Sequence, residues 1–227
     1  ACHYRCGIKG VLLGLPEVKL GIIPGAGGTQ RLPRLIDGQT AMDMMISGNP
    51  VDSEQGLELG ILDKVVSGDL LSDALNWIKE QIKGEVAIRR TSELIPVGNI
   101  NFEEVRKFSL EKFKGYPAPM AIIDAVEAAY NKPFPSGIAL ERQLINKLFL
   151  TTESLALRHL FFTERLAAKV PDIDKSVPLL EIKKAAVIGG GLMGGGITMN
   201  FANAGIPVSM IETSEERLKL GYETIKK

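Results

Sequence analysis

Three glycines near the end of the chain, Gly189, Gly191 and Gly194, have the spacing G-x-G-x-x-G that binds dinucleotide phosphates when it joins a strand to a helix. The first glycine permits a tight turn, the second lets the backbone approach a pyrophosphate, and the third lets the helix pack against the strand. The N-terminus of that helix would offer unpaired N–H groups to the phosphates, those of Leu192 and Met193 among them. The spacing therefore predicts a pyrophosphate-binding turn.

Two strands and a helix must surround this turn for the spacing to have that meaning. Residues 184–188 form a lysine-led apolar run, 194–204 have helical character, and 207–211 form a second apolar run. Glu212 comes next and follows Gly189 by 23 residues, close to the roughly 20 expected for the carboxylate that binds the ribose hydroxyls. Because this carboxylate would repel a 2′-phosphate, the pattern favours NAD over NADP. The simpler interpretation is a glycine-rich turn beside a surface glutamate.

A second candidate for chemistry is Glu17, which follows Gly14, Leu15 and Pro16 near the start of the chain. Apolar neighbours withdraw water from a carboxylate and favour its protonated form, which suits proton exchange at the carbon beside a thioester carbonyl. A glutamate at a turn is more often a solvated side chain without such a role. The residues after Glu17 must therefore decide between the two interpretations.

The glycines that follow Glu17 predict a tight turn beside that carboxylate. Gly25, Gly27 and Gly28 let the backbone bend sharply, and a helix is expected to begin around Thr29. The same glycines would also serve a turn that binds nothing. Local spacing alone leaves both roles open.

The residues around both candidates resemble known families. The stretch 13–34, LGLPEVKLGIIPGAGGTQRLPR, resembles the acyl-CoA site of the crotonase (enoyl-CoA hydratase/isomerase) superfamily. The stretch 186–212, AVIGGGLMGGGITMNFANAGIPVSMIE, resembles the opening βαβ unit of 3-hydroxyacyl-CoA dehydrogenases, in which the LMGGGI run is typical. The stretch 151–172, TTESLALRHLFFTERLAAKVPD, resembles the helical connector between these parts in multifunctional fatty acid β-oxidation enzymes. The resemblance spans essentially the whole chain.

This resemblance implies roles for individual residues. Glu17 is expected to be the acid/base glutamate that exchanges a proton with C2 of the acyl group. The implied substrate contacts lie in the same stretch and are Gly14, Leu15, Pro16, Pro24 and Gly25. A second, water-activating glutamate and the oxyanion-hole amides are expected before Ala1, and the dehydrogenase histidine beyond residue 227. The chain is therefore expected to be an internal part of a longer protein whose remainder completes both sites, with His159 structural or at the surface.

The implied activity is hydration of trans-2-enoyl-CoA to 3-hydroxyacyl-CoA, followed by hydride transfer from C3 to NAD. Isomerisation of 3-enoyl-CoA at the first site stays open, because one glutamate serves either reaction. A non-catalytic module that binds NAD and acyl-CoA is one alternative, and a truncated product without activity is another. The expected partner is an acyl-CoA thioester.

The composition favours small-molecule chemistry. Lys plus Arg equals Asp plus Glu at 27 each, so no net charge attracts nucleic acid or an anionic membrane. No run of 18 apolar residues predicts a transmembrane segment. Cys2, His3, Cys6 and distant His159 make a poor zinc site, so no metal and free thiols in a reducing compartment are expected. Bacterial cytoplasm and peroxisome both fit.

The periodicity and the resemblance together predict an α/β fold with three parts. They are the C-terminal part of a crotonase-like domain over 1–100, a helical connector over 101–178, and the first βαβ unit of a Rossmann NAD-binding domain over 179–227. A strand is expected over 61–66. Helices are expected over 40–48, 53–60, 69–83, 102–114, 120–131, 138–169 with a break near 151–152, and 215–227.

Two of these helices have apolar surfaces that predict buried contacts. Helix 69–83 is expected to cover a core with one stripe, formed by Leu71, Ala74, Leu75, Ile78 and Ile82. Helix 138–169 is expected to pack in the core or between domains through Phe149, Leu155, Leu157, Leu160, Phe161 and Phe162. Residues 170–178, with two prolines, have the composition of a linker.

Overall fold

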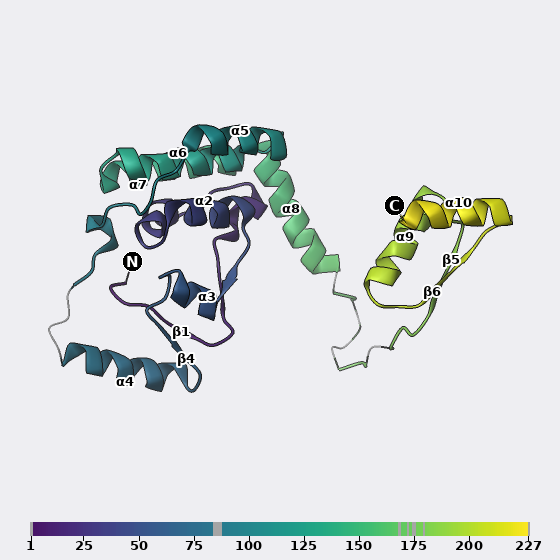
Figure 1. Cartoon of the computed structure of the whole chain (residues 1–227), viewed down its shortest axis with the longest axis horizontal. Coiled ribbons are helices and arrows are strands. Elements are labelled where there is room, and N and C mark those ends of the chain that lie inside the picture. The colour runs from purple at the N-terminus through teal and green to yellow at the C-terminus, as the bar shows by residue number, and fades with distance from the viewer. Residues whose placement is uncertain are drawn as a thin grey trace. The chain divides into compact units, whose positions relative to one another are not determined.

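The computed structural model of the chain describes residues 2–83, 88–167, 169–171, 173, 176–178 and 180–226. The chain divides into two compact units, Ala1–Lys169 and Val170–Lys227, and each is described by itself (Figure 1). Both units combine helices with short strands, so the predicted α/β class is confirmed. Within the described residues, no helix has both the length and the apolar character that crossing a bilayer requires.

The strands of the first unit form two small sheets. In one sheet, β1 (Cys6–Ile8) pairs in parallel with β4 (Lys64–Val66). In the other, β2 (Leu12–Leu13) pairs antiparallel with β3 (Val51–Asp52). The predicted strand over 61–66 is confirmed only from Lys64, because the residues before it form a turn in which Leu62 N donates to Gly56 O. Strand β2 leads directly into the segment that contains Glu17.

Helices dominate the rest of the first unit. In chain order, with η for a 3-10 helix, they are η1 (Pro16–Leu20), α1 (Gly28–Arg31), η2 (Leu32–Arg34), α2 (Gly38–Ser47), α3 (Ser53–Glu58), α4 (Leu70–Ile82), η3 (Thr91–Glu93), α5 (Phe102–Lys112), α6 (Pro117–Asn131), α7 (Phe134–Phe149) and α8 (Thr152–Ala167). The break predicted near 151–152 is confirmed, since the Thr151 hydroxyl accepts from Ser154 N and donates to Leu148 O. Helices α6 and α7 begin earlier than predicted because proline is accommodated in a first helical turn.

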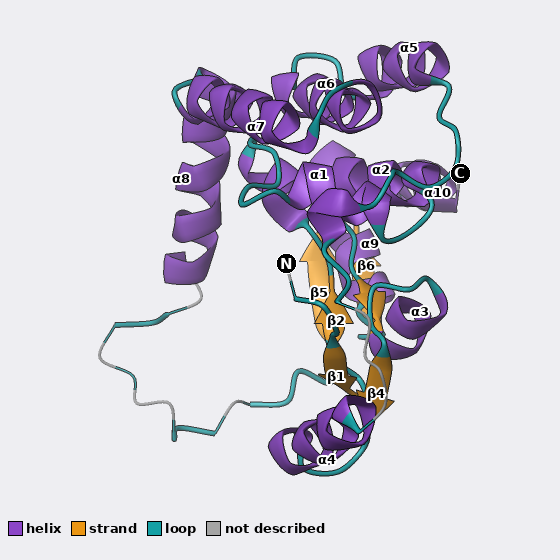
Figure 2. Ribbon diagram, turned by 90° about the vertical axis from the view of Figure 1, so that its left-hand side faces the viewer, coloured by secondary structure: helices purple, strands orange, loops and turns teal. Residues whose placement is uncertain are grey.

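The core of the first unit lies between α2 and α6. Met42 and Met45 of α2 are fully buried with Ile122, Ile123 and Val126 of α6 in one hydrophobic cluster. In both views, α6 and α7 lie side by side above α2 (Figures 1 and 2). Helices α6 and α7 contact α1, which follows the glycine-rich turn, while η1, the helix that contains Glu17, contacts α2 and α8.

The prediction that helix 69–83 covers a core with its apolar stripe is wrong. Leu71 is 69% exposed and Ile82 is 66% exposed, and α4 has no buried residue. The helix contacts β1 and β4 through a side that includes Trp77 and the half-buried Ala74 and Ile78 of the stripe, and Trp77 packs edge-on against Tyr4 with 6.0 Å between ring centroids. Periodicity identifies an apolar face, but burial requires an opposing surface, and none covers Leu71, Leu75 and Ile82 in the described part of the chain.

The prediction that helix 138–169 packs in the core is also wrong for much of its apolar surface. Phe149, Leu155, Leu160 and Phe162 are between 46% and 61% exposed. The reason is that α8 projects beyond the layer of α5, α6 and α7, as Figure 2 shows. Its first turn packs on η1, while its later turns form one wall of a cavity.

The second unit contains a strand, a helix and a second strand in succession. Strand β5 (Ala185–Ile188) pairs in parallel with β6 (Val208–Ile211), with Val187 opposite Met210. Helix α9 (Leu192–Asn203) connects the two strands, and α10 (Glu215–Lys226) follows β6 and packs on α9. This is the predicted βαβ order.

Candidate functional site

Glu17 lies in η1, a short helix that begins with a proline and ends at a glycine. Pro16 occupies the first turn, and Gly21 ends the helix with its N–H donating to Val18 O at 2.9 Å. A Cβ at Gly21 would lie 2.8 Å from the backbone of Ser154, so α8 can approach only a glycine here. Glu17 is half-buried, and its Oε2 atom is buried without a hydrogen-bond partner among the described residues. A buried carboxylate oxygen without a partner is uncommon in a folded protein, and a role at a binding site is one explanation for it.

Glu17 lines a cavity of about 540 Å³ between η1 and α8. The residues from η1 are Pro16, Glu17, Lys19 and Leu20, and those from α8 are Leu157, Leu160, Phe161, Glu164 and Arg165. Ser154 fixes α8 beside η1, because its buried hydroxyl donates to Leu20 O at 2.9 Å. The cavity therefore places Glu17 opposite an α8 wall that has three apolar side chains, one further carboxylate and one guanidinium group.

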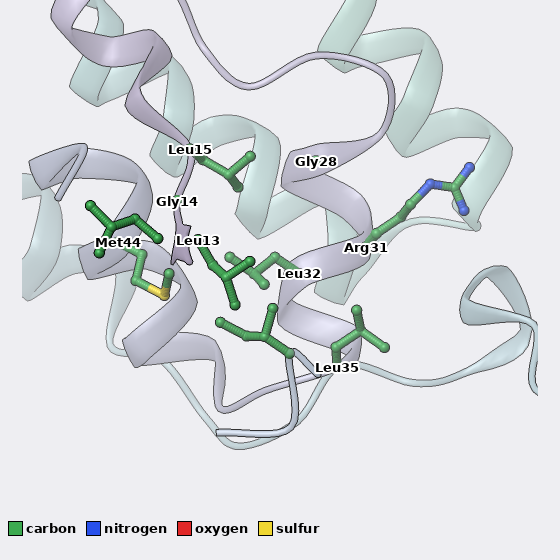
Figure 3. Close-up of a pocket in the computed structure, with 10 residues that line it drawn as sticks. Leu13, Gly14, Leu15, Gly28, Arg31, Leu32, Leu35 and Met44 are labelled. Carbon is green, nitrogen blue, oxygen red and sulfur yellow. The ribbon is translucent and has the colours of Figure 1, made fainter. Parts of the chain in front are cut away.

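Gly14 and Leu15 line a second, smaller cavity of about 380 Å³, shown in Figure 3. Leucines from several elements surround it, and Arg31 points away from them (Figure 3). No carboxylate lines this cavity. The segment Gly14–Glu17 thus has its first two residues on an apolar cavity and its last two on the cavity that contains the acid.

The remaining predicted substrate contacts, Pro24 and Gly25, line neither of these two cavities. Pro24 is fully buried, and a Cβ at Gly28 would lie 2.9 Å from it. A Cβ at Gly25 would lie 3.2 Å from Ile145 of α7. Both residues therefore pack within the fold, and a contact with substrate stays a prediction for them.

The glycine-rich turn is held by a buried carboxylate that the sequence did not reveal. Glu141 of α7 is 3% exposed. Its carboxylate accepts from Gly27 N at 2.7 Å, from Thr29 N at 3.1 Å and from Thr29 Oγ1 at 2.6 Å. A glutamate at an inward position of an otherwise amphipathic helix was the only signal for it in the sequence.

The polar residues after the turn bind backbone oxygens of neighbouring segments. Gln30 Nε2 donates to Ala125 O at 2.7 Å. The guanidinium of Arg34 donates to Gln30 O at 2.5 Å, to Ala129 O at 2.9 Å and to Leu94 O at 3.0 Å. Burial lowers the pKa of Arg34 from its ordinary value. These side chains attach the turn to α6 and are structural supports.

The second unit brings its predicted glycines and Glu212 together. Gly189 has φ 95°, a left-handed conformation that suits glycine, and α9 begins at Leu192. A Cβ at Gly194 would collide with the carbonyl oxygen of Gly189, whereas a Cβ at Gly191 would meet open space. The turn therefore packs closely on the helix at Gly194 and leaves open space at Gly191.

Glu212 is bonded directly to the glycine turn. Its Oε1 accepts from Gly190 N at 2.6 Å, and its Oε2 accepts from Thr213 N at 3.0 Å. These backbone bonds, that from Gly190 first, hold the pKa of Glu212 below its ordinary value. Leu192 and Met193, the first residues of α9, are 94% and 75% exposed.

Gly221 of α10 was not recognised in the sequence as part of this arrangement. A Cβ at this position would lie 2.7 Å from the carbonyl oxygen of Gly190. The helix can therefore pack against the turn only because the residue is glycine. Its position outside the G-x-G-x-x-G pattern hid it.

Two protein families match the chain. An enoyl-CoA hydratase/isomerase family matches residues 4–112, and a 3-hydroxyacyl-CoA dehydrogenase NAD binding domain family matches residues 184–227. Among solved structures, a carnitinyl-CoA hydratase from Mycobacterium avium is 18% identical, with a TM-score of 0.46 over 71% of this chain and 52% of that one.

Relatives that contain both regions align with nearly all of the chain. A fatty acid oxidation complex subunit alpha from Shewanella frigidimarina is 39% identical over 96% of the chain, and a peroxisomal fatty acid beta-oxidation multifunctional protein from Arabidopsis thaliana is 34% identical over 100% of it. The chain spans 32% of the length of each. The chain is therefore similar, along nearly its whole length, to one third of these multifunctional fatty acid β-oxidation proteins, and its enoyl-CoA hydratase/isomerase match precedes its 3-hydroxyacyl-CoA dehydrogenase match.

Proposed function

We propose that the chain takes part in two consecutive reactions, hydration of trans-2-enoyl-CoA and NAD-dependent oxidation of the resulting 3-hydroxyacyl-CoA. The observation that carries the first reaction is the buried, unpartnered Oε2 of Glu17 beside an apolar cavity. The order of the two matched families supports the pairing. The relatives come from a bacterium and from a plant peroxisome, and a bacterial cytoplasm or a peroxisome is the location we propose.

In the first reaction, Glu17 exchanges a proton with C2 of the acyl group. Water adds its oxygen to C3 and gives one of its protons to the group that activates it, while the carboxylic acid of Glu17 gives its proton to C2. Glu17 regains a proton by exchange with that group or with solvent before the next turnover. Apolar side chains of α8, Leu157, Leu160 and Phe161, line the cavity beside the acid. Because the relatives are about three times as long, we propose that water activation and oxyanion stabilisation come from residues outside these 227.

Isomerisation of 3-enoyl-CoA is a second candidate for the same cavity. It moves a proton from C2 to C4 and needs no activated water, so one carboxylate suffices. The position of Glu17 in the cavity is compatible with either reaction. Product analysis with 3-enoyl-CoA and trans-2-enoyl-CoA as alternative substrates separates them.

In the second unit, the residues of the turn fit the pyrophosphate and ribose of NAD. Space beside Gly191 admits a phosphate, and the exposed N-terminal residues of α9 present their amides there. Each oxygen of Glu212 accepts one backbone N–H and keeps a second lone pair for a ribose hydroxyl. When bound, NAD accepts the hydride from C3 of the substrate. Within this chain, the residues bind and orient the cofactor.

Substitution of Glu17 tests the proposal most directly. In the protein at its full natural length, Glu17→Gln should lower the rate of crotonyl-CoA hydration by about 100-fold or more, because the amide cannot exchange the proton. Oxidation of 3-hydroxybutyryl-CoA with NAD should be unchanged. The exposed Glu58→Gln on α3 is the matched control and should leave both rates as they are.

Two outcomes would contradict the proposal. Equal loss of both activities in Glu17→Gln would argue against separate sites. Absence of crotonyl-CoA turnover in the unsubstituted protein, with NADH still bound in a fluorescence titration, would favour the non-catalytic binding module.

A further inference from the structure

The turn between Gly25 and Thr29 has a backbone conformation that needs outside support. Ala26 has φ 53° and Gly27 has φ 84°, so two successive residues are left-handed and one of them has a side chain. A residue other than glycine stays in this region only when the surrounding contacts determine it. The hydrogen bonds to Glu141 reach both Gly27 and Thr29, immediately after Ala26.

The hydrogen bonds between Glu141 and the turn stabilise both the carboxylate and the groups that donate to it. All three donors are neutral, two backbone amides and one hydroxyl, and the acceptor is a buried carboxylate. Without the carboxylate, the donors would lose their partner inside the protein; without the donors, the charge would be buried unpaired. The left-handed turn and Glu141 therefore depend on one another.

The glycine-rich turn also lies close to the residues that precede Glu17. Gly28, between the two bonded residues of the turn, would place a Cβ 3.7 Å from the side chain of Leu15 and 2.9 Å from Pro24. Leu15 immediately precedes η1, the helix that contains Glu17. At the other end of η1, Ser154 of α8 donates to Leu20 O. Helix α7, through the glycine-rich turn, and helix α8 thus act at opposite ends of the segment that contains the acid.

We propose that Glu141 is a positioning residue for the hydration reaction. Its carboxylate holds the Gly27–Thr29 turn, the turn holds Leu15, and Leu15 sets the place of Glu17 beside the cavity. The inference rests on the proposed role of Glu17 as the acid. It assigns a function to a helix for which the sequence predicted only packing.

Glu141→Gln in the full-length protein is the primary test. The substitution keeps the shape of the side chain but replaces one oxygen by an NH₂ group that faces N–H and O–H donors. The kcat for crotonyl-CoA hydration should fall about tenfold to 100-fold, since a small displacement of a catalytic group has effects of this size. The KM should change less than kcat. NAD-dependent oxidation of 3-hydroxybutyryl-CoA should be unchanged, and so should both rates in the exposed control Glu111→Gln.

A pair of substitutions at Thr29 gives a second, milder test that serves if Glu141→Gln does not fold. Thr29→Val removes the hydroxyl bond to Glu141 together with the bond that this hydroxyl accepts from Gln30 Nε2, and should lower the hydration kcat by about threefold to tenfold. Thr29→Ser retains the hydroxyl and should restore most of the rate. Circular dichroism at the assay temperature verifies that each variant is folded.

The outcomes separate failure of this inference from failure of the proposed function. If Glu17→Gln abolishes hydration while folded Glu141→Gln keeps the full kcat, the positioning role is wrong and the acid is right. Equal hydration rates for Thr29→Val and Thr29→Ser also overturn the positioning role. If Glu17→Gln retains hydration, the proposed function itself fails. Parallel loss of both enzymatic activities in Glu141→Gln would indicate a general structural role and overturn the inference.

Discussion

The two glycine-rich turns of this chain are held in place by different means. The turn of the second unit is supported by residues near it in the sequence, with Glu212 bonded to Gly190 across 22 residues. The turn of the first unit is supported by Glu141, which lies 114 residues from Gly27. The second unit's turn is supported within its own strand–helix–strand unit, whereas the first unit's turn depends on contacts with the distant helices α6 and α7.

This difference predicts that the first turn is sensitive to loss of a distant polar bond. Arg34→Met should lower the free energy of unfolding by about 2–4 kcal/mol, because three backbone oxygens lose a buried charged donor. The fluorescence of Trp77, the single tryptophan of the chain, follows unfolding of this unit in urea.

Arg31→Met is the matched control for Arg34→Met. Both guanidinium groups lie over the ring of Phe134, at 5.0 and 5.3 Å from its centroid, but the Nε of Arg31 has no hydrogen-bond partner among the residues that the structure describes. Loss of the cation–π contact alone should cost about 1 kcal/mol or less. Equal losses for the two variants would show that stacking, and not the bonds to carbonyl oxygens, supports the turn.

The second turn should instead be sensitive to steric change within its own unit. Gly194→Ala should weaken NAD binding about tenfold to 100-fold, or roughly 1.4–2.8 kcal/mol, because the new Cβ would collide with the Gly189 carbonyl oxygen. A titration that follows NADH fluorescence measures the affinity. Crotonyl-CoA hydration should be unaffected.

Gly196→Ala, in the same helix, is the control for Gly194→Ala. A Cβ at Gly196 meets open space, so the change should raise helix stability by about 0.5–1 kcal/mol without loss of NAD binding. If both alanines weakened NAD binding equally, close packing of the turn on α9 would not explain the effect.

The smallest expected effect is a pH dependence at Glu212. Its pKa is lowered by the N–H groups of Gly190 and Thr213, so the folded state binds this proton less tightly than the unfolded state. The resulting stability is present above the unfolded-state pKa and is lost as the pH falls through the folded-state pKa. Thermal unfolding between about pH 6 and pH 3 should show a smaller acid loss in Glu212→Gln than in the unsubstituted protein.

Glu223→Gln, an exposed change on α10, controls for loss of one carboxylate from the second unit. Its acid profile should match that of the unsubstituted protein. If the Glu212→Gln profile also matched it, the local bond between Gly190 and Glu212 would contribute nothing to stability.

Much of the fold was predictable, because the relevant signals are local. Gly48 ends α2 at the end of the predicted helix 40–48, and Thr151 separates α7 from α8 at the predicted break. The wrong predictions concern burial. The stripe of Leu71 and Ile82 is apolar but exposed, because amphipathicity does not specify what opposes it.

The candidate sites divide in the same way. The spacing of Gly189, Gly194 and Glu212 predicted that these residues come together, and the structure brings them together. The catalytic and binding roles of these residues and of Glu17 stay predictions. Pattern alone did not identify the apolar wall on α8, since Leu157 and Phe161 have the character of ordinary packing residues.

By itself, the sequence determined the two glycine turns, the acid between proline and valine at position 17, and the order of the two enzyme regions. Those features depend on the backbone freedom of glycine and on spacing along the chain, which are properties of short segments. Only the tertiary structure decided that Glu141 supports the first turn and that α8 lines the cavity beside Glu17. Burial and hydrogen-bond pairing depend on which distant segments meet, and that is settled only when the whole unit packs.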